Sequence, residues 1–305
     1  MTAQPAQTLS RTYGLERRVF RAMGTTIELL LDSGFTRAGR TALAEAEAEF
    51  SRLECILSRF RPASELSALN EAGTMTVGPE LLELTALALD ARERTGGRFD
   101  PTVHEAVVAA GYDRTFDDVP AVDEDAPPAP RRCGGRVRID RGRSLIELGP
   151  GVRLDFGGIA KGFAADRVSE SLGELGGCLV NAGGDAAVHG RLGGEAWPVG
   201  VETGDGLITL ALTSGAIATT GRDRRRWLRN GAERHHIIDP ASGRPSRTDL
   251  LRVTVVAGSA VEAEVLATSL FLAGKQAAAR EADELGIPSL LVTADGRTVF
   301  AGGLG

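Results

Sequence analysis

Apolar residues return at helical spacing in the first part of the chain. The repeating positions are Leu43, Ala46, Phe50, Leu53 and Leu57. They predict a helix that ends in a loop over residues 58–62. The preceding segment, residues 19–31, has a strand pattern with a turn or bulge near Met23. A second helix is expected from about Pro79 to Arg94, stopping at the glycine pair that follows.

The rest of the chain mixes short strands with helices. Residues 117–135 hold four prolines and predict a long surface loop. A strand running into Asp155 is expected before a glycine turn and a helix. The helix positions are Ala160, Ala164, Val168, Leu172 and Leu175. Further strands are expected at 137–140, 144–148, 178–181, 197–201, 207–212 and 251–256, helices at 262–272 and 277–285, and two strands at the end. Because strands and helices do not alternate strictly, we expect an α+β fold of mixed α/β layers.

Length and charge narrow the class of protein. The 305 residues fit one large domain or two intimate ones. We expect an N-terminal extension over residues 1–18 and a single domain over residues 19–305. The net charge of -6 argues against a nucleic-acid binder, because phosphate binding needs a basic surface.

Cysteine spacing and apolar runs predict a cytoplasmic location. The three cysteines are far apart in the sequence and form no CxxC motif, which favours free thiols in a reducing compartment. The N-terminus shows no apolar segment of a signal peptide and no cysteine that could take a lipid. The longest apolar run, residues 27–31, is far shorter than the ~20 residues of a membrane helix, so no membrane insertion is expected.

Two glycine-rich strand ends carry candidate chemistry. Residues 154–162 read LDFGGIAKG, where glycines let a ligand approach the backbone, a helix N-terminus offers free N–H groups and Lys161 adds a positive charge. This suits a diphosphate, although an ordinary strand–helix turn is an equal alternative. The pattern is neither GxGxxG nor a P-loop. The second segment, residues 181–185, ends in Asp185, and a simple hairpin is the alternative there.

Three further groups of residues complete the candidates. His235 and His236 are adjacent, so in a strand one ring can enter a pocket while the other faces solvent or packing. His236 is a plausible general base, with a structural histidine as the alternative. Glu264 and Thr268 share one helix face and could hold Mg²⁺ with ligand phosphates, unless they belong to a solvated surface. An arginine run surrounds Trp227, either as a solvated hairpin or as a docking patch for an acidic partner.

In this order, the motifs resemble those of the ApbE family, the FAD:protein FMN transferases. They are MGT at 23–25, LSRF at 57–60, SELS at 64–67 with Asn70, RFDPT at 98–102, DFGGIAKG at 155–162, GGD at 183–185, HHIIDP at 235–240 and AEVLAT at 263–268. The resemblance runs from about Val19 to Gly303 and implies a T-fold-related architecture with FAD in a cleft.

The resemblance also implies roles for residues. Met23, Phe60 and the stretch Arg98, Phe99 and Asp100 would contact the adenine and ribose end of FAD, and Asp155, Lys161 and Ile237 would belong to the FAD site. Mg²⁺ would be held by the backbone carbonyl of Gly158 and the side chains of Glu264 and Thr268. His236 and Asp185 are the candidates for acid–base work.

The implied reaction is phosphoryl transfer. A Thr or Ser hydroxyl of an acceptor protein attacks the flavin-side phosphorus of FAD, AMP leaves, and FMN stays as a phosphoester. Two alternatives remain at this point: an FAD pyrophosphatase that uses water, and an FAD-binding protein without catalysis. Glu264 departs from the usual family aspartate, which supports the second alternative. The chain also lacks the export signal of many members and differs at residues 219–222.

Overall fold

An antiparallel sheet of eight strands forms the centre of the structure. The computed structural model describes residues 14–123 and 132–304. The sheet order is β1 (Leu15–Ala22), β2 (Thr25–Asp32), β7 (Gly177–Ala182), β8 (Asp185–His189), β11 (Gly215–Gly221), β16 (Leu250–Ala257), β17 (Ser289–Thr293) and β18 (Thr298–Ala301). Each strand is antiparallel to its neighbour.

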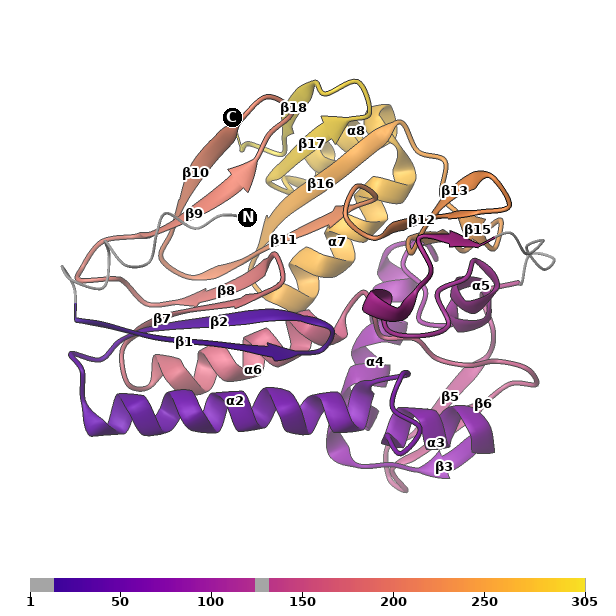
Figure 1. The fold of residues 1–305 in the computed structure, drawn as a ribbon, viewed down its shortest axis with the longest axis horizontal. Helices are drawn as coiled ribbons and strands as arrows, with labels where there is room; N and C mark the ends of the chain where they lie inside the picture. Colours follow the sequence, from indigo (N-terminus) through magenta and orange to yellow (C-terminus); the bar gives the residue numbers. More distant parts are fainter. Residues whose placement is uncertain (1–13, 124–131, 305) are drawn as a thin grey trace.

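Four helices cover one face of this sheet, and a hairpin covers the other (Figure 1). The helices are α2 (Arg37–Leu57), α6 (Ala160–Gly173), α7 (Ala260–Ala273) and α8 (Lys275–Leu285). The hairpin consists of β9 (Trp197–Glu202) and β10 (Leu207–Leu212). In β11, Ala216 and Ala218 face the helices, while Ile217 packs with Trp197 of the hairpin. The sheet is therefore buried on both faces near its centre.

The remaining elements gather at one end of the sheet (Figure 1). One group is α3 (Glu65–Ala72), β3 (Thr74–Thr76), α4 (Pro79–Arg94), β5 (Val137–Asp140) and β6 (Leu145–Leu148). The other is α5 (His104–Ala109), the 3₁₀ turn η1 (Phe116–Asp118), β4 (Val122–Asp123), β12 (Arg226–Arg229), β13 (Ala232–His235), β14 (Ile238–Asp239) and β15 (Arg244–Pro245). They form small sheets in the orders β3-β6-β5, β13-β12-β4 and β14-β15.

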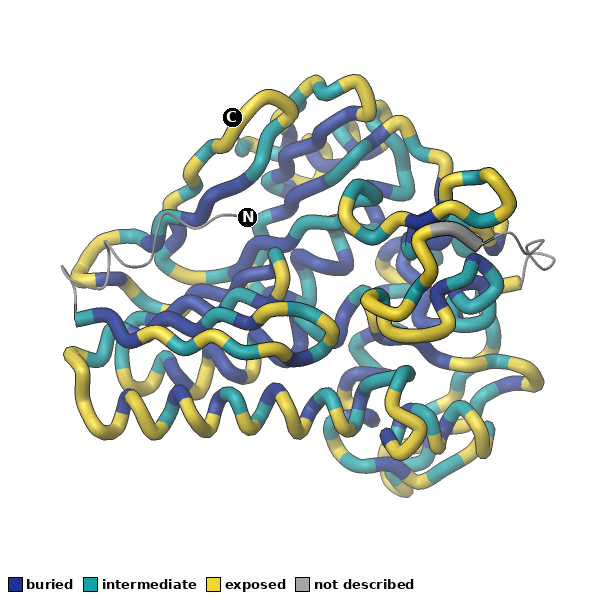
Figure 2. Tube along the Cα trace, viewed as in Figure 1, coloured by how far each residue is buried: buried dark blue, intermediate teal, exposed yellow. Residues whose placement is uncertain are grey.

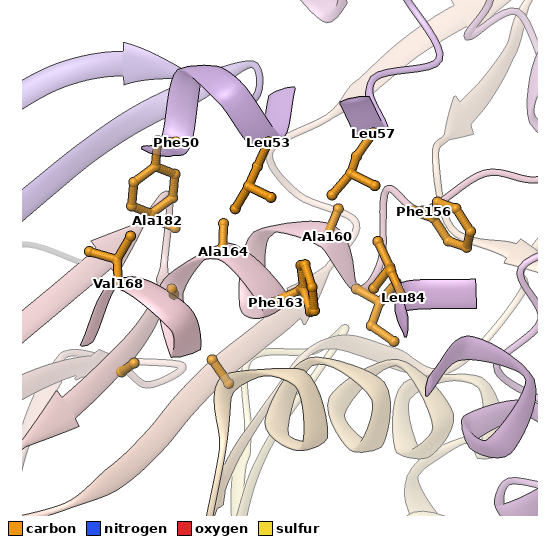
Figure 3. Close-up of a cluster of buried hydrophobic side chains, with 14 of the residues drawn as sticks. Phe50, Leu53, Leu57, Leu84, Phe156, Ala160, Phe163, Ala164, Val168 and Ala182 are labelled. Atoms are coloured by element: carbon orange, nitrogen blue, oxygen red, sulfur yellow. The ribbon is translucent and has the colours of Figure 1, made fainter. Parts of the chain in front are cut away.

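The main core lies between α2, α6 and the sheet. Buried and exposed residues alternate along α2 in Figure 2, as the apolar spacing of its sequence requires. Phe50, Leu53 and Leu57 are buried, and Figure 3 shows them in a row along α6, near Val168, Ala164 and Ala160 respectively. Phe156 is also buried in this core, so its side chain fixes the start of the glycine turn that follows it.

Helices α6 and α7 start side by side, and a carboxylate joins them. Asp166 of α6 accepts hydrogen bonds from Ala260 N at 2.7 Å and Val261 N at 3.0 Å, two free N–H groups of the first turn of α7. Gly162 permits the close approach, because a Cβ there would lie 2.7 Å from the backbone of Ala260. These contacts place the first turn of α7 against residues 162–166 of α6.

The structure confirms most of the expected elements and corrects some. Residues 152–156 form no strand, so the strand expected into Asp155 is wrong; Asp155 N instead bonds the carbonyl of Pro101. Strand β1 begins at Leu15 rather than at residue 19, and α7 and α8 begin at Ala260 and Lys275. The helix α3 was not expected; Ser64 caps its first turn by accepting from Ser67 N.

Some expectations lie partly outside the described residues. Residues 1–13 of the expected extension and 124–131 of the expected loop are not described. The described part of that loop contains η1 and β4, and β4 pairs with β12. The assignment of residues 19–305 to a single domain stays a proposal. Among the described helices, none combines the length and the apolar character needed to cross a membrane.

Replacing Gly162 by alanine should destabilise the protein. Alanine normally favours a helix over glycine, but here its Cβ would collide with the backbone of α7. Overpacking of this kind costs about 1–3 kcal/mol. Chemical denaturation should therefore show a lower free energy of unfolding for Gly162→Ala, and no such loss for Glu170→Ala on the exposed face of α6. An unchanged free energy for Gly162→Ala would contradict the close packing of α6 and α7.

Candidate functional site

The site residues predicted from the sequence line a single cavity of about 510 Å³. They are Met23, Phe60, Arg98, Phe99, Asp100, Asp155, Gly158, Lys161, Asp185, His236, Ile237, Glu264 and Thr268. They come from the β1–β2 turn, the loops after α2 and α4, the start of α6, strand β8, the segment after β13, and α7. The structure thus brings the predicted residues together, while their individual roles stay predictions.

Three buried charges meet at one side of the cavity. Lys161 Nζ lies 2.7 Å from Asp185 Oδ2 and also contacts Glu264 Oε1. Glu264 Oε2 accepts a hydrogen bond of 3.0 Å from Gly162 N. We call Lys161, Asp185 and Glu264 the charge cluster. It joins α6, β8 and α7, and each member is mostly hidden from solvent.

Within the charge cluster, burial and the neighbouring charges shift the pKa values of Lys161 and Glu264 in opposite directions. Burial lowers the pKa of Lys161, but Asp185 and Glu264 together raise it above its usual value. Burial raises the pKa of Glu264, and the nearby lysine offsets this only in part. One ammonium therefore faces two carboxylates, and the surplus negative charge favours a second cation at this position.

The oxygen atoms beside Glu264 fit a hard divalent cation. Thr268 lies one helical turn after Glu264, and its hydroxyl contacts Thr220 Oγ1 at 2.9 Å. Gly158 also lines the cavity, and as a glycine it presents only backbone atoms there. Within the described ranges, no group of three His, Cys, Asp or Glu side chains is placed to hold a metal. Mg²⁺ commonly needs only one or two carboxylates when substrate phosphates complete its shell, so this donor set is suitable.

A second buried ion pair, between Arg59 and Asp155, also lines the cavity. Arg59 Nε lies 2.7 Å from Asp155 Oδ2, and both side chains are at most 8% exposed. Asp155 Oδ1 accepts from Gly157 N at 2.7 Å, which fixes the glycine turn before Gly158. The Arg59 guanidinium lies over Phe60 and Tyr112, 4.0 and 4.8 Å from the ring centroids, and donates to the Tyr112 carbonyl. Asp155 therefore positions the loop as well as lining the cavity.

Arg98 and Asp100 line the cavity but are already engaged with neighbours. Arg98 Nε donates to Ser269 Oγ at 2.9 Å, and its Nη2 pairs with Glu281 of α8. Asp100 Oδ1 accepts from both the backbone N and the hydroxyl of Thr102, at 2.8 and 2.7 Å. These contacts hold the loop after α4 in place, so the two residues shape the wall whether or not they touch a ligand.

The two adjacent histidines separate as expected. His235 ends β13, is buried, and lies 3.0 Å from the Ser246 carbonyl through Nε2. His236 lines the cavity, and its Nδ1 is buried with no hydrogen-bond partner among the described residues. It lies in a bend after the strand rather than in the strand itself. Burial, then the charge of Arg225, lowers the pKa of His236 to about 3, so its ring is neutral at neutral pH.

Sequence reasoning missed several residues of the cavity wall. Tyr112 follows α5 and contacts the rings of Phe60 and Trp227, with centroids 5.5 and 5.9 Å apart. Thr219 N donates to Asp185 Oδ1 at 3.2 Å from the neighbouring strand. Tyr112 belongs to no periodic pattern or motif that would have indicated its place in the cavity. Arg59 was also missed, although its position just before Phe60 in the LSRF motif could have indicated that it lines the cavity.

The chain is similar to known proteins in both sequence and fold. A family model described as the ApbE family matches residues 23–291. The FAD:protein FMN transferase of Treponema pallidum is 31% identical over 291 residues, covering 86% of this chain and 80% of that protein. The structure of the ApbE protein from Thermotoga maritima has a TM-score of 0.81 and 26% identity, covering 94% and 97% of the two chains. Flavin transferase ApbE from Vibrio cholerae has a TM-score of 0.75 at 25% identity, with the same coverage.

Fold and site together define an α+β enzyme with a charged cavity large enough for a cofactor-sized ligand. The match over most of the sequence then makes the family plain: the chain belongs to the ApbE family. The expected ApbE-like fold and the expected transferase class are both confirmed.

Breaking the Arg59–Asp155 pair should destabilise the fold. Arg59→Met leaves the Asp155 carboxylate buried without its cation, a change that typically costs about 3–5 kcal/mol. Arg61→Met is the matched control, because its pair with Glu54 is more exposed and such pairs contribute only about 0–1 kcal/mol. Urea denaturation measures both losses. Equal losses in the two variants would contradict the structural role of the buried pair.

The buried neutral His236 should make the protein less stable in acid. Its pKa is about 3 when folded, against roughly 6.5 in the unfolded chain, so the unfolded state binds the extra proton first. The contribution of His236 to the free energy of unfolding is therefore fully present above pH 6.5. It falls as the pH drops toward 3, by up to about 1.4 kcal/mol per pH unit. His236→Gln should flatten this slope in denaturation experiments between pH 7 and 4, whereas replacing the exposed His189 should not. Parallel slopes for His236→Gln and the native protein would refute the assignment.

Proposed function

We propose that this chain is a Mg²⁺-dependent FAD:protein FMN transferase, which moves FMN from FAD to a Thr or Ser hydroxyl of an acceptor protein and releases AMP. The observation that carries the proposal is the charge cluster in the cavity wall, with Thr268 one helical turn from Glu264. Names of the similar proteins support the same activity. The acceptor would be a separate protein with a Thr or Ser in its target motif.

FAD would span the cavity between its two walls. Met23 and Phe60, with the stretch from Arg98 to Asp100, would meet the adenine and ribose end. Lys161, Asp155 and Ile237 would lie along the flavin nucleotide. The cavity of about 510 Å³ lies within the usual range of roughly 300–1,000 Å³ for small-molecule sites. Both aromatic and charged groups are therefore present for a ligand that combines ring systems with phosphates.

Catalysis would rest on positioning and charge. When bound at Glu264, Thr268 and the Gly158 carbonyl, Mg²⁺ would neutralise pyrophosphate charge and orient it for in-line attack. Lys161 would turn its ammonium from Glu264 toward a phosphate oxygen. Both Asp185 oxygens are engaged with neighbours, so Asp185 would hold Lys161 in place.

His236 is the better candidate for the proton transfer. Its ring is neutral, and its buried Nδ1 has no hydrogen-bond partner among the described residues, so this nitrogen is not committed to a neighbour. As a base it would accept the proton of the acceptor hydroxyl during attack on the flavin-side phosphorus. The approach of phosphate charge raises the pKa of a neutral imidazole, which improves it as a base. General base catalysis of this kind typically contributes 10²–10⁴-fold.

The direct test is incubation of the purified chain with FAD and Mg²⁺, with and without an FMN-accepting domain. Chromatography measures AMP and FMN, and mass spectrometry measures the intact acceptor. We expect AMP together with an acceptor heavier by one FMN. AMP and free FMN with an unmodified acceptor would identify a pyrophosphatase instead. Intact FAD in every sample would identify a binding protein, and Glu264→Asp would then be the first change to make.

Alanine at either metal-binding position should separate turnover from binding. Glu264→Ala and Thr268→Ala each remove an oxygen ligand, so Mg²⁺-dependent AMP release should fall more than FAD affinity does. A Mg²⁺ titration of AMP release and a fluorescence titration of FAD measure the two effects. Full activity in both variants at limiting Mg²⁺ would show that the metal lies elsewhere.

A further inference from the structure

Nearly all cations that line the cavity already have an anionic partner. Six of them form an ion pair with a carboxylate: Arg59, Arg61, Arg98, Lys161, Arg224 and Arg252. Arg225 is different, since it lines the cavity but has no carboxylate within ion-pair distance among the described residues. Its side chain donates a long hydrogen bond of 3.4 Å to the carbonyl of Gly24. Arg225 is thus a cation of the cavity with its charge uncompensated.

The position of Arg225 is defined by its neighbours. It precedes β12, and its side chain reaches the β1–β2 turn, where Gly24 follows Met23. Its charge also acts on His236: burial is the largest cause of the lowered pKa of His236, and the positive charge of Arg225 is the second largest. Arg225 therefore lines the cavity beside the β1–β2 turn and close enough to His236 to affect the pKa of its ring.

We propose that Arg225 binds the pyrophosphate of FAD on its adenosine side and carries the negative charge of the departing AMP. This rests on the proposed function. A guanidinium offers paired N–H donors that match phosphate oxygens, and a cation that is not yet neutralised binds them most strongly. The other arginines of the run are engaged differently: Arg224 pairs with Glu202, and Arg226 pairs with Glu233 across the hairpin.

Arg225 would assist the step in which FMN passes from FAD to the acceptor hydroxyl. The acceptor oxygen bonds to the flavin-side phosphorus, and the bond from that phosphorus to the bridging oxygen breaks. The proton of the acceptor hydroxyl passes to His236. The electron pair of the broken bond stays on the AMP phosphate, where Arg225 offsets the added negative charge. No oxidant or further reactant is needed.

Two neighbouring variants provide the test. Arg225→Gln removes the cavity cation, and Arg226→Gln removes an equal charge whose side chain does not line the cavity. FAD affinity is measured by flavin fluorescence in EDTA, where no turnover occurs, and riboflavin is titrated as a ligand without phosphate. Charge-assisted hydrogen bonds predict a loss of about 10-fold or more in FAD affinity for Arg225→Gln. Riboflavin affinity of Arg225→Gln should stay within about 2-fold of the native value, and Arg226→Gln should match the native protein in FAD affinity. Arg225→Lys keeps the positive charge but loses the paired N–H donors, so its FAD affinity should lie between those of Arg225→Gln and the native protein.

Because FAD binding is measured apart from turnover, a wrong assignment of Arg225 can be distinguished from a wrong function. Equal FAD affinity in Arg225→Gln and Arg226→Gln would overturn the assignment of Arg225. If FAD affinity is unchanged but the KM for the acceptor rises, Arg225 contacts the acceptor instead, and the pyrophosphate assignment is also overturned. Loss of FAD affinity in Arg225→Gln supports it even if the native chain transfers no FMN, because binding is measured without turnover.

Discussion

The ion contact between Lys161, Asp185 and Glu264 is the interaction on which the rest of the site depends. It joins two helices and a strand that are distant in the sequence, and it does so within a buried region where an unpaired charge would be costly. Three features of the fold make it possible: the small Gly162, the cap that Asp166 gives to α7, and the apolar core under the glycine turn. The core thus holds the polar groups at fixed positions before any ligand binds.

The cavity wall carries two distinct arrangements of charge. In the charge cluster, two carboxylates face a single ammonium, which suits a divalent cation. At Arg225, an uncompensated guanidinium suits phosphate oxygens. A pyrophosphate that bridges a metal ion and Arg225 would satisfy both. His236 has a neutral ring near Arg225 and Lys161, so proton transfer through it would not add a further positive charge beforehand.

Sequence patterns predicted the helices where an apolar signal repeats, and dense motifs predicted a set of residues that the fold brings together. The spacing from Leu43 to Leu57 predicted α2, and the ordered motifs predicted residues that all line one cavity. Long-range contacts could not be predicted. Nothing near Tyr112 indicates that it packs over Arg59, and the extended segment before Asp155 looks like a strand although no partner strand lies beside it. The arginine run looked uniform in sequence; only the fold shows that Arg225 differs from its neighbours.

A crystal structure with FAD and Mn²⁺ would show whether the charge cluster forms the metal and phosphate side of an FAD site. Anomalous scattering locates Mn²⁺ without ambiguity. We predict a peak bonded to the oxygens of Glu264 and Thr268 and to the pyrophosphate, with Lys161 turned toward a phosphate oxygen. FAD bound in the cavity with no metal at Glu264, or with Lys161 still held between both carboxylates, would contradict it.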